Sequence, residues 1–193
     1  MKLNIPNRLT LLRIIMVPVF LVLLVAVPFR SETVRSIVCA SVFLLTCLTD
    51  TLDGIIARRK NMITDLGKFL DPLADKFLVF AALLGILVRY DHFKYVFIWA
   101  AAVVIFRELA VTSLRLVVVG KSDVVIAASI LGKIKTGSQM TCVMTILLEP
   151  VLLPCFNETH VLSYATMAIM TFMTLWSGID YFVKYGKYIA KEK

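Results

Sequence analysis

The sequence predicts an all-α integral membrane protein with six transmembrane helices, an N-terminal interfacial helix and both termini in the cytoplasm. Hydrophobic residues make up 60% of the 193 residues and charged residues 18%, whereas a typical soluble domain is about half apolar and about a quarter charged. The mean hydropathy is +0.88. The apolar residues also come in blocks of about twenty, which is the length of helix that crosses a hydrocarbon core.

The apolar blocks divide the chain into spans, each predicted to be helical because lipid offers no hydrogen-bond partner to an unpaired backbone amide. Residues 1–9 contain Pro6 and lead into the first span without a clear cleavage site, which favours a short interfacial helix over a signal peptide. Short connections near 30–33 and 89–94 predict antiparallel hairpins, and residues 1–193 are expected to form a single membrane domain. The predicted spans cover residues 10–29, 34–57, 69–88, 95–119, 125–148 and 161–183.

The cationic residues predict the orientation of the spans. With the N-terminus inside, 17 of the 21 Lys and Arg residues fall in cytoplasmic segments, and only Arg30, Arg35, Arg89 and Lys94 fall in outer loops. This bias predicts cytoplasmic termini by the positive-inside rule. The net charge of +8 then belongs to a basic face against anionic lipid head groups, and no basic domain away from the membrane favours nucleic-acid binding. The expected location is a bacterial plasma membrane.

Five aspartates interrupt the apolar pattern within residues 48–76. On a helix turning 100° per residue, Asp50, Asp53, Gly54 and Ala57 fall within an arc of about 100°. One face of this helix is therefore acidic and carries little bulk, which would let a flat base or a ribose approach the backbone closely.

A second helix is expected to complete the acidic site. Gly67, Asp71 and Asp75 follow one another at four-residue spacing and share a narrow face. A turn around residues 59–66 joins the two helices and can bring four carboxylates together. Asp65 lies in that turn and is expected to be an ordinary solvated loop residue.

Four converging carboxylates require positive charge nearby, because they repel one another and are costly to desolvate. Hard cations such as Mg²⁺ or Mn²⁺ prefer carboxylate oxygen, and the only histidines, His92 and His160, are expected in outer loops, which disfavours zinc. Two such ions can clamp a phosphoryl group and stabilise its entering and leaving oxygens. The pattern therefore favours phosphoryl or phosphatidyl transfer, with Arg58 able to make a forked contact to a diphosphate.

Other interpretations of these residues stay open. A single acidic pair at a helix end is often a solvated cap, and glycines are often notches for helix packing, but several inward-facing carboxylates in a membrane protein are costly and usually functional. In a divalent cation transporter, the aspartates would be expected near the middle of the bilayer. In this chain they lie beside Arg58, Arg59 and Lys60, near the predicted cytoplasmic boundary.

The aspartate pattern reads D50-x2-D53-G54-x2-A57-R58-x8-G67-x3-D71-x3-D75. It resembles the signature of the CDP-alcohol phosphotransferase family at all eight named positions, and the predicted spans extend the resemblance along the chain. The resemblance implies six transmembrane helices and a homodimer. It also implies transfer of a phosphatidyl group from CDP-diacylglycerol to an alcohol, with release of CMP.

The resemblance implies roles for individual residues. Asp50, Asp53, Asp71 and Asp75 would ligate two divalent ions, Mg²⁺ or Mn²⁺, and Asp75 would also be the general base. The spacing alone does not decide which aspartate is the base, although a metal acidifies a bound alcohol, so that a weak base suffices. Contacts with the cytidine diphosphate part of the donor are implied for Asp50, Gly54, Arg58, Thr64 and Gly67.

Cationic residues in the second half of the chain indicate the chemical class of the acceptor alcohol. Arg107 and Arg115 lie about 80° apart on one predicted helical face, with Glu108 adjacent, and Lys133 and Lys135 follow at the cytoplasmic start of the next span. Such fixed cations favour an acceptor that carries its own phosphate over choline or ethanolamine. Alternatively, these cations are anchors that snorkel to lipid phosphates. The two lysines are predicted to point apart by about 160°, so both need not face one pocket.

Three segments narrow the resemblance: NIPNRLTLLR, FRELAVTSLR and LGKIKT. They are similar to segments of family members whose acceptor is sn-glycerol 3-phosphate and whose product is phosphatidylglycerophosphate. Inositol phosphate, serine and phosphatidylglycerol are alternative acceptors. Asn7, Thr10 and Arg13 are expected either to hold a head group or to anchor the helix at the interface. The implied contacts with the acceptor's phosphate are Arg107, Arg115, Lys133 and Lys135.

Overall fold

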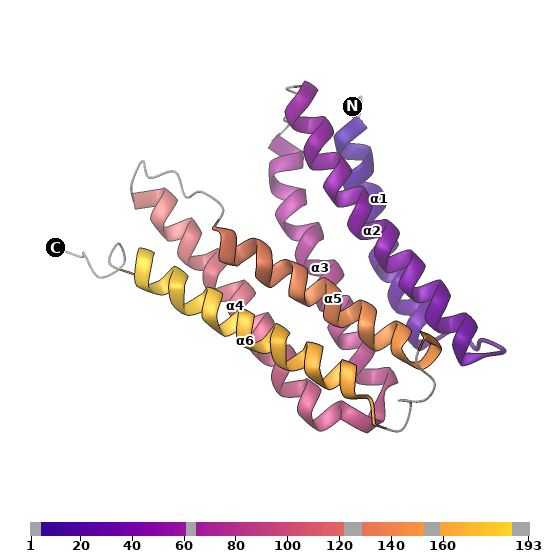
Figure 1. Cartoon of the computed structure of the whole chain (residues 1–193). Coiled ribbons are helices and arrows are strands. Elements are labelled where there is room, and N and C mark those ends of the chain that lie inside the picture. The colour runs from indigo at the N-terminus through magenta and orange to yellow at the C-terminus, as the bar shows by residue number, and fades with distance from the viewer. Residues whose placement is uncertain (1–4, 61–64, 122–128, 153–158, 187–193) are drawn as a thin grey trace. The chain divides into compact units, whose positions relative to one another are not determined.

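The computed structural model of the chain describes residues 5–60, 65–121, 129–152 and 159–186, with side chains described for 10–49, 76–118, 129–152 and 159–186. The described residues form six α-helices and one short 3-10 helix, and they contain no β-strand (Figure 1). The helices are α1 (Ile5–Val25), α2 (Glu32–Lys60), α3 (Asp65–Arg89), α4 (Lys94–Lys121), α5 (Ile130–Leu152) and α6 (Val161–Tyr185), with the 3-10 helix η1 at Asp91–Phe93.

The six predicted spans each coincide with one α-helix, so the predicted helix count is confirmed within the described residues. The largest differences lie in α1 and α5. α1 begins at Ile5 and ends at Val25, whereas the expected span covered residues 10–29, and α5 begins at Ile130 and ends at Leu152, whereas the expected span covered residues 125–148. The amides of Ala26 and Val27 close the last turn on the carbonyl of Val22, and Pro28 then prevents the preceding residue from continuing the helix. No helix boundary separates an interfacial segment from the first span at residues 9 and 10.

Several helices are long and apolar enough to cross a membrane. Among the described residues these are Glu32–Thr49, Asp91–Val118 and Val161–Tyr185, and Thr10–Val25 of α1 is a shorter apolar helix. Large apolar side chains on these helices face outward, with Trp99 75% and Val183 76% exposed. Contiguous exposed apolar surface of this kind is matched to lipid rather than to water, and the chain is therefore an α-helical membrane protein.

The chain divides into two compact units, of which the first comprises residues 1–92 and 146–159. In this unit α1 packs against both α2 and α3. The rings of Phe20 and Phe43 lie 5.7 Å apart between α1 and α2. A Cβ atom at Gly85 of α3 would lie only 2.7 Å from Cδ2 of Leu24, so α3 approaches α1 closely here, and a larger residue would require the Leu24 side chain to move.

One end of the first unit is held by an ion cluster. Glu32, the first residue of α2, pairs with Arg35 one turn later and with Arg89 at the end of α3. Arg35 also places its guanidinium 5.6 Å from the ring centroid of Phe29. This cluster links the α1–α2 connection to α3, at the end of the unit that the sequence assigns to the outer side.

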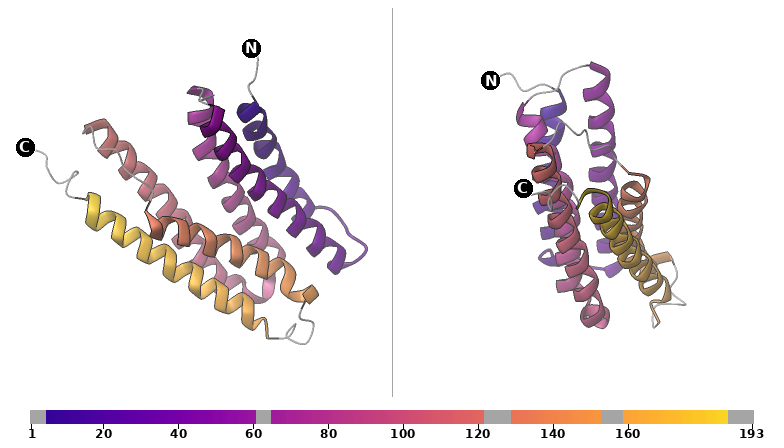
Figure 2. Two further views of the ribbon diagram at one scale, coloured as in Figure 1. Left: turned by 45° about the horizontal axis from the view of Figure 1, so that its top comes forward. Right: turned by 90° about the vertical axis from the view of Figure 1, so that its left-hand side faces the viewer.

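The second unit comprises residues 93–145 and 160–193, and in it α4 and α6 run side by side (Figure 2). At one end, the ring of Phe93 meets those of Phe97, His160 and Tyr164 at centroid distances of 5.7 to 6.3 Å. At the other end, Tyr181 is buried with apolar residues of α4 and its ring centroid lies 4.7 Å from that of Tyr185. Aromatic rings thus meet across the helix pair at one end, and at the other end an aromatic ring of α6 packs on aliphatic residues of α4.

Candidate functional site

The aspartate pattern falls on two helices of the first unit, as expected. Asp50, Asp53, Gly54 and Arg58 belong to α2, while Gly67, Asp71 and Asp75 belong to α3. The side chains of residues 50–75 lie outside the described part of the chain, and Thr64 lies in the undescribed segment 61–64. The shared faces predicted for these residues assume a rotation of 100° per residue, which applies only within a continuous helix. The helical backbone of α2 and α3 meets that condition.

The prediction for Asp65 was wrong in one respect. Asp65 was expected in the turn between the two helices, but it is the first residue of α3. α2 also continues through Lys60, so the connection is shorter than the predicted turn.

Two of the predicted head-group residues are buried in α1. Thr10 is 2% exposed and Arg13 is 1% exposed, and Arg13 is among the largest fully buried side chains. An anchor that snorkels to the interface keeps its charged end in water, so this burial favours an internal role over an interfacial one. The side chain of Asn7 lies outside the described residues.

A cluster of four polar side chains joins α4, α5 and α6 in the second unit; it consists of Arg107, Glu108, Lys135 and Ser177 and is called the polar cluster below. Nη2 of Arg107 donates a hydrogen bond of 2.7 Å to Oγ of Ser177. Nη1 of Arg107 lies 3.3 Å from Oε1 of Glu108, and Nζ of Lys135 donates to the same carboxylate oxygen. Each of the three helices therefore contributes at least one group.

The charges of the polar cluster are largely removed from solvent. The side chains of Arg107, Glu108 and Lys135 are 12%, 13% and 5% exposed. Desolvation costs several kcal/mol per ion even after relaxation, so such groups persist where they are paired or functional. Two cations around one carboxylate leave the polar cluster with a formal net charge of +1, which suits an anionic ligand.

The two other predicted cations do not join the polar cluster. Arg115 and Lys133 are exposed, whereas Lys135, two residues further on α5, is buried. The opposite exposure of Lys133 and Lys135 agrees with the wide angle predicted between them. Arg115 shares a broad helical face with Arg107 but lies two turns further along α4, about 12 Å along the helix axis.

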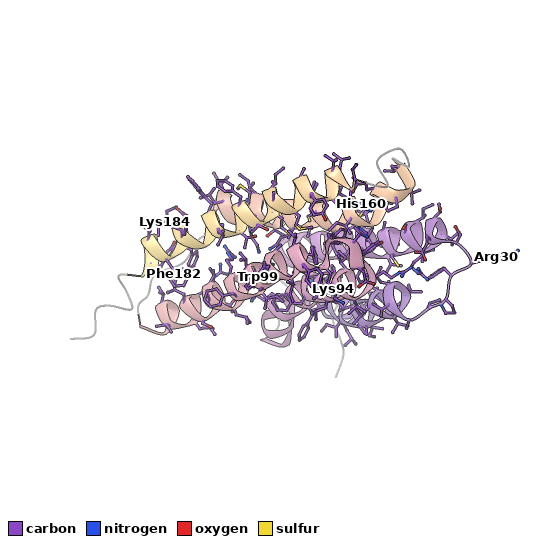
Figure 3. All side chains as sticks on the ribbon, turned by 90° about the horizontal axis from the view of Figure 1, so that it is seen from below. Arg30, Lys94, Trp99, His160, Phe182 and Lys184 are labelled. Carbon is purple, nitrogen blue, oxygen red and sulfur yellow. The ribbon has the colours of Figure 1, made fainter. Side chains whose placement is uncertain are left out.

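An apolar groove of about 570 Å³ runs between α4 and α6 beside the polar cluster. Trp99 of α4 and Phe182 of α6, both labelled in Figure 3, line it. Arg107 is the one charged residue among its described lining residues. The groove therefore brings a mostly apolar surface next to a single cationic side chain.

Sequence reasoning identified Arg107, Glu108 and Lys135, but it missed Ser177. The Lys135–Glu108 pair spans 27 residues and the Arg107–Ser177 pair spans 70, and no local spacing encodes such contacts. Ser177 is one of several hydroxyl residues in its span, so its residue type gave no specific signal. Among the side chains that the structure describes, no three His, Cys, Asp or Glu residues come together to hold a metal ion.

These features define the class of the molecule, a helical membrane protein with buried charged groups in membrane-spanning segments and an aspartate pattern on two adjoining helices. The model of the CDP-alcohol phosphatidyltransferase family matches residues 3–176. The chain therefore belongs to this family, and the resemblance inferred from the aspartate spacing is confirmed.

Relatives with similar sequences cover nearly the whole chain. It is 42% identical to the CDP-diacylglycerol--glycerol-3-phosphate 3-phosphatidyltransferase of Bacillus subtilis over 190 residues, which is 94% of each chain. It is 37% identical to the protein of the same name from Sodalis glossinidius, again over 94% of each chain. It is also 38% identical to a probable phosphatidylglycerophosphate synthase of Mycobacterium tuberculosis, over 92% of this chain and 79% of the relative.

Proposed function

We propose that this chain transfers the phosphatidyl group of CDP-diacylglycerol to sn-glycerol 3-phosphate, giving phosphatidylglycerophosphate and CMP. The observation that carries the proposal is the similarity to relatives with this activity in their names, at 37 and 42% identity over 94% of the chain. The buried, net cationic polar cluster supports an acceptor that brings its own phosphate.

Four carboxylates form the proposed metal site: Asp50, Asp53, Asp71 and Asp75. They fit Mg²⁺ or Mn²⁺, because all are hard oxygen donors and the continuous helices α2 and α3 carry them at spacings that favour one face each. Two bound ions would supply positive charge to the diphosphate and to the oxygens that enter and leave. The aspartates lie near the predicted cytoplasmic boundary, which favours a membrane transferase over a cation transporter with acidic residues near the middle of the bilayer.

Residues of the aspartate pattern are also proposed to bind the donor and to remove the proton of the acceptor's hydroxyl. Asp50, Gly54, Arg58, Thr64 and Gly67 are proposed to contact the cytidine diphosphate part, with the guanidinium of Arg58 forked on the diphosphate. The acceptor's hydroxyl oxygen attacks the phosphorus that carries the diacylglycerol. The bond from that phosphorus to the CMP oxygen breaks, and Asp75 takes the hydroxyl proton.

The acceptor is proposed to bind through its phosphate at Arg107 and Lys135, the two cations of the polar cluster. Arg115 and Lys133 are exposed, and we assign them to attraction of the acceptor toward the site. Salt screens the attraction between these exposed cations and the acceptor, and it screens the attraction of the less exposed Arg107 and Lys135 much less. Asn7, Thr10 and Arg13 of α1 are proposed to contact a substrate head group.

The proposed setting is a bacterial plasma membrane. We place both termini and the active site on the cytoplasmic side, because 17 of the 21 Lys and Arg residues then lie there. We also propose that the two compact units act as one membrane domain and that two copies of the chain form a homodimer. A site at this boundary lets a lipid donor meet a water-soluble acceptor.

The test is an assay of the purified protein in mixed micelles with CDP-diacylglycerol, Mg²⁺ and a panel of acceptors. We expect CMP release and a new phosphatidylglycerophosphate lipid with glycerol 3-phosphate, and neither with serine, inositol phosphate or phosphatidylglycerol. Asp71→Asn and Asp75→Asn should each lower turnover by about a hundredfold or more, while Asp65→Asn, outside the aspartate pattern, serves as the matched control. A product formed with inositol phosphate alone would refute the acceptor.

A further inference from the structure

The charge of the polar cluster is unevenly shared between its two cations. Glu108 accepts a hydrogen bond from Lys135 and a longer one, of 3.3 Å, from Nη1 of Arg107. The close partner of Arg107 is instead the neutral hydroxyl of Ser177, at 2.7 Å from Nη2. A hydroxyl orients a guanidinium without neutralising it, so the contact with Ser177 leaves the charge of Arg107 available to an anion.

Helix α6 also fixes the stem of Arg107. Gly178 follows Ser177, and a Cβ atom at this position would lie 3.2 Å from Cγ of Arg107, which is tighter than an ordinary van der Waals contact. Ser177 is 2% exposed and Gly178 is buried. The Ser177–Gly178 step therefore holds the head of Arg107 by a hydrogen bond and leaves room for its stem.

Arg107 retains donor capacity in this position. Its Nε is buried and has no hydrogen-bond partner within the described residues. A guanidinium can offer Nε and one Nη together in a planar fork that matches phosphate oxygens. Holding Nη2 on Ser177 fixes the plane of this fork in advance, which reduces the rotamer entropy that an arginine loses on binding.

We propose that Ser177 and Gly178 are positioning residues that orient Arg107 toward the phosphate of the acceptor, so that α6 contributes to acceptor selection. This inference rests on the proposed function, because it takes glycerol 3-phosphate as the ligand of Arg107. Ser177 acts through its hydrogen bond, and Gly178 acts by the absence of a side chain.

The experiment compares Ser177→Ala and Gly178→Ala with wild type, in kinetics and in binding. Loss of a hydrogen bond to a charged group predicts a rise of about tenfold in KM for glycerol 3-phosphate. KM for CDP-diacylglycerol and kcat at saturating acceptor should change by less than about twofold, because neither residue is proposed to touch the donor or the reacting hydroxyl of the acceptor. Ser177→Thr, which keeps the hydroxyl, should recover most of the acceptor KM.

Gly137→Ala is the matched control, because Gly137 lies in α5 and a Cβ atom there meets nothing within 4 Å. A second readout is the rise in Tm that glycerol 3-phosphate, and not glycerol, gives to the detergent-purified protein. We expect this rise in wild type and Gly137→Ala and a smaller one in Ser177→Ala and Gly178→Ala.

Two outcomes would overturn the inference. In one, both α6 variants have a lower Tm without ligand but keep the wild-type acceptor KM, which would make the step purely structural. In the other, the KM values for donor and acceptor rise together. If wild type binds and uses another phosphorylated acceptor in place of glycerol 3-phosphate, the proposed function fails, and the same variants then decide the role of α6 with that acceptor.

Discussion

Lys135 of α5 donates a hydrogen bond to Glu108 of α4, and both side chains are almost entirely buried. The two residues are 27 positions apart in the sequence, and they link two helices of the second unit. An ion pair removed from water gains little net stability over an apolar pair of the same shape. Its retention in a membrane-spanning segment is therefore better explained by function than by stability.

Removing one member of this pair should be costly. Glu108→Gln takes the Glu108 carboxylate away from both Lys135 and Arg107, and we expect the free energy of unfolding to fall by about 3 kcal/mol. The measurement is thermal or denaturant unfolding of the detergent-purified protein. Replacing both residues, as Glu108→Leu with Lys135→Met, should restore only part of the stability, because Arg107 would still lack the carboxylate of Glu108, and it should leave acceptor turnover impaired.

The control for this pair is Asp180→Asn, which breaks an exposed pair with Lys184 one turn away on α6. That pair is open to solvent, and its loss should change stability by less than about 1 kcal/mol. Equal losses in Glu108→Gln and Asp180→Asn would show that burial does not raise the cost of breaking the Glu108–Lys135 pair.

Removal of divalent ions should stop the reaction. With EDTA in excess, turnover is expected to fall by about a hundredfold or more, because the proposed metal charge stabilises the transition state by several kcal/mol. Addition of Mg²⁺ or Mn²⁺ beyond the chelator should restore it. Undiminished CMP release in metal-free buffer would remove the basis for assigning four aspartates to metal binding.

The sequence predicted the helices well because each depends on local properties. Lipid imposes helical structure on every long apolar block. The helices α2, α3, α4 and α6 begin and end within about four residues of their predicted spans, whereas α5 lies further along the chain than expected. The end of α1 was less predictable, because the apolar block continues past the point where Pro28 stops the helix. The family was also predictable, since the aspartate pattern lies within 26 consecutive residues.

Contacts between distant helices could not be predicted in the same way. Arg107 and Arg115 belong to the same predicted face, but only Arg107 lies level with Ser177 of α6, where its side chain is largely shielded from solvent. The residue spacing predicts the direction in which a side chain points around the helix axis. It does not predict which neighbouring helix lies beside that part of the axis. The partners of Arg107 and Lys135 therefore required the structure.

The Gly85 contact predicts energetic coupling between α1 and α3. Gly85→Ala would place its Cβ 2.7 Å from Leu24 Cδ2 and 3.1 Å from Leu21 Cδ1, and Leu24 is 1% exposed. Overpacking of this kind should lower the free energy of unfolding by about 1 to 3 kcal/mol. In a Leu24→Ala background the same substitution should cost much less, because the obstructing methyl group is gone. Additive losses in the double variant would show that the two side chains do not meet.

Site-directed labelling tests the proposed orientation of the chain. Arg30 and Lys184 are both exposed, and they lie near the end of α1 and the end of α6. The positive-inside rule places Arg30 outside and Lys184 inside. In a Cys155→Ser background, an impermeant maleimide should label Arg30→Cys in intact cells.

The same reagent should label Lys184→Cys only after the membrane is permeabilised. Cys39, Cys47 and Cys142 are buried, so the background chain with Cys155→Ser should stay unlabelled in both conditions and serves as the control. Labelling of Lys184→Cys in intact cells would place the C-terminal end of α6 on the outer side. Because the cations of the aspartate pattern were assigned to the same side as Lys184, that result would also move the proposed active site away from the cytoplasm.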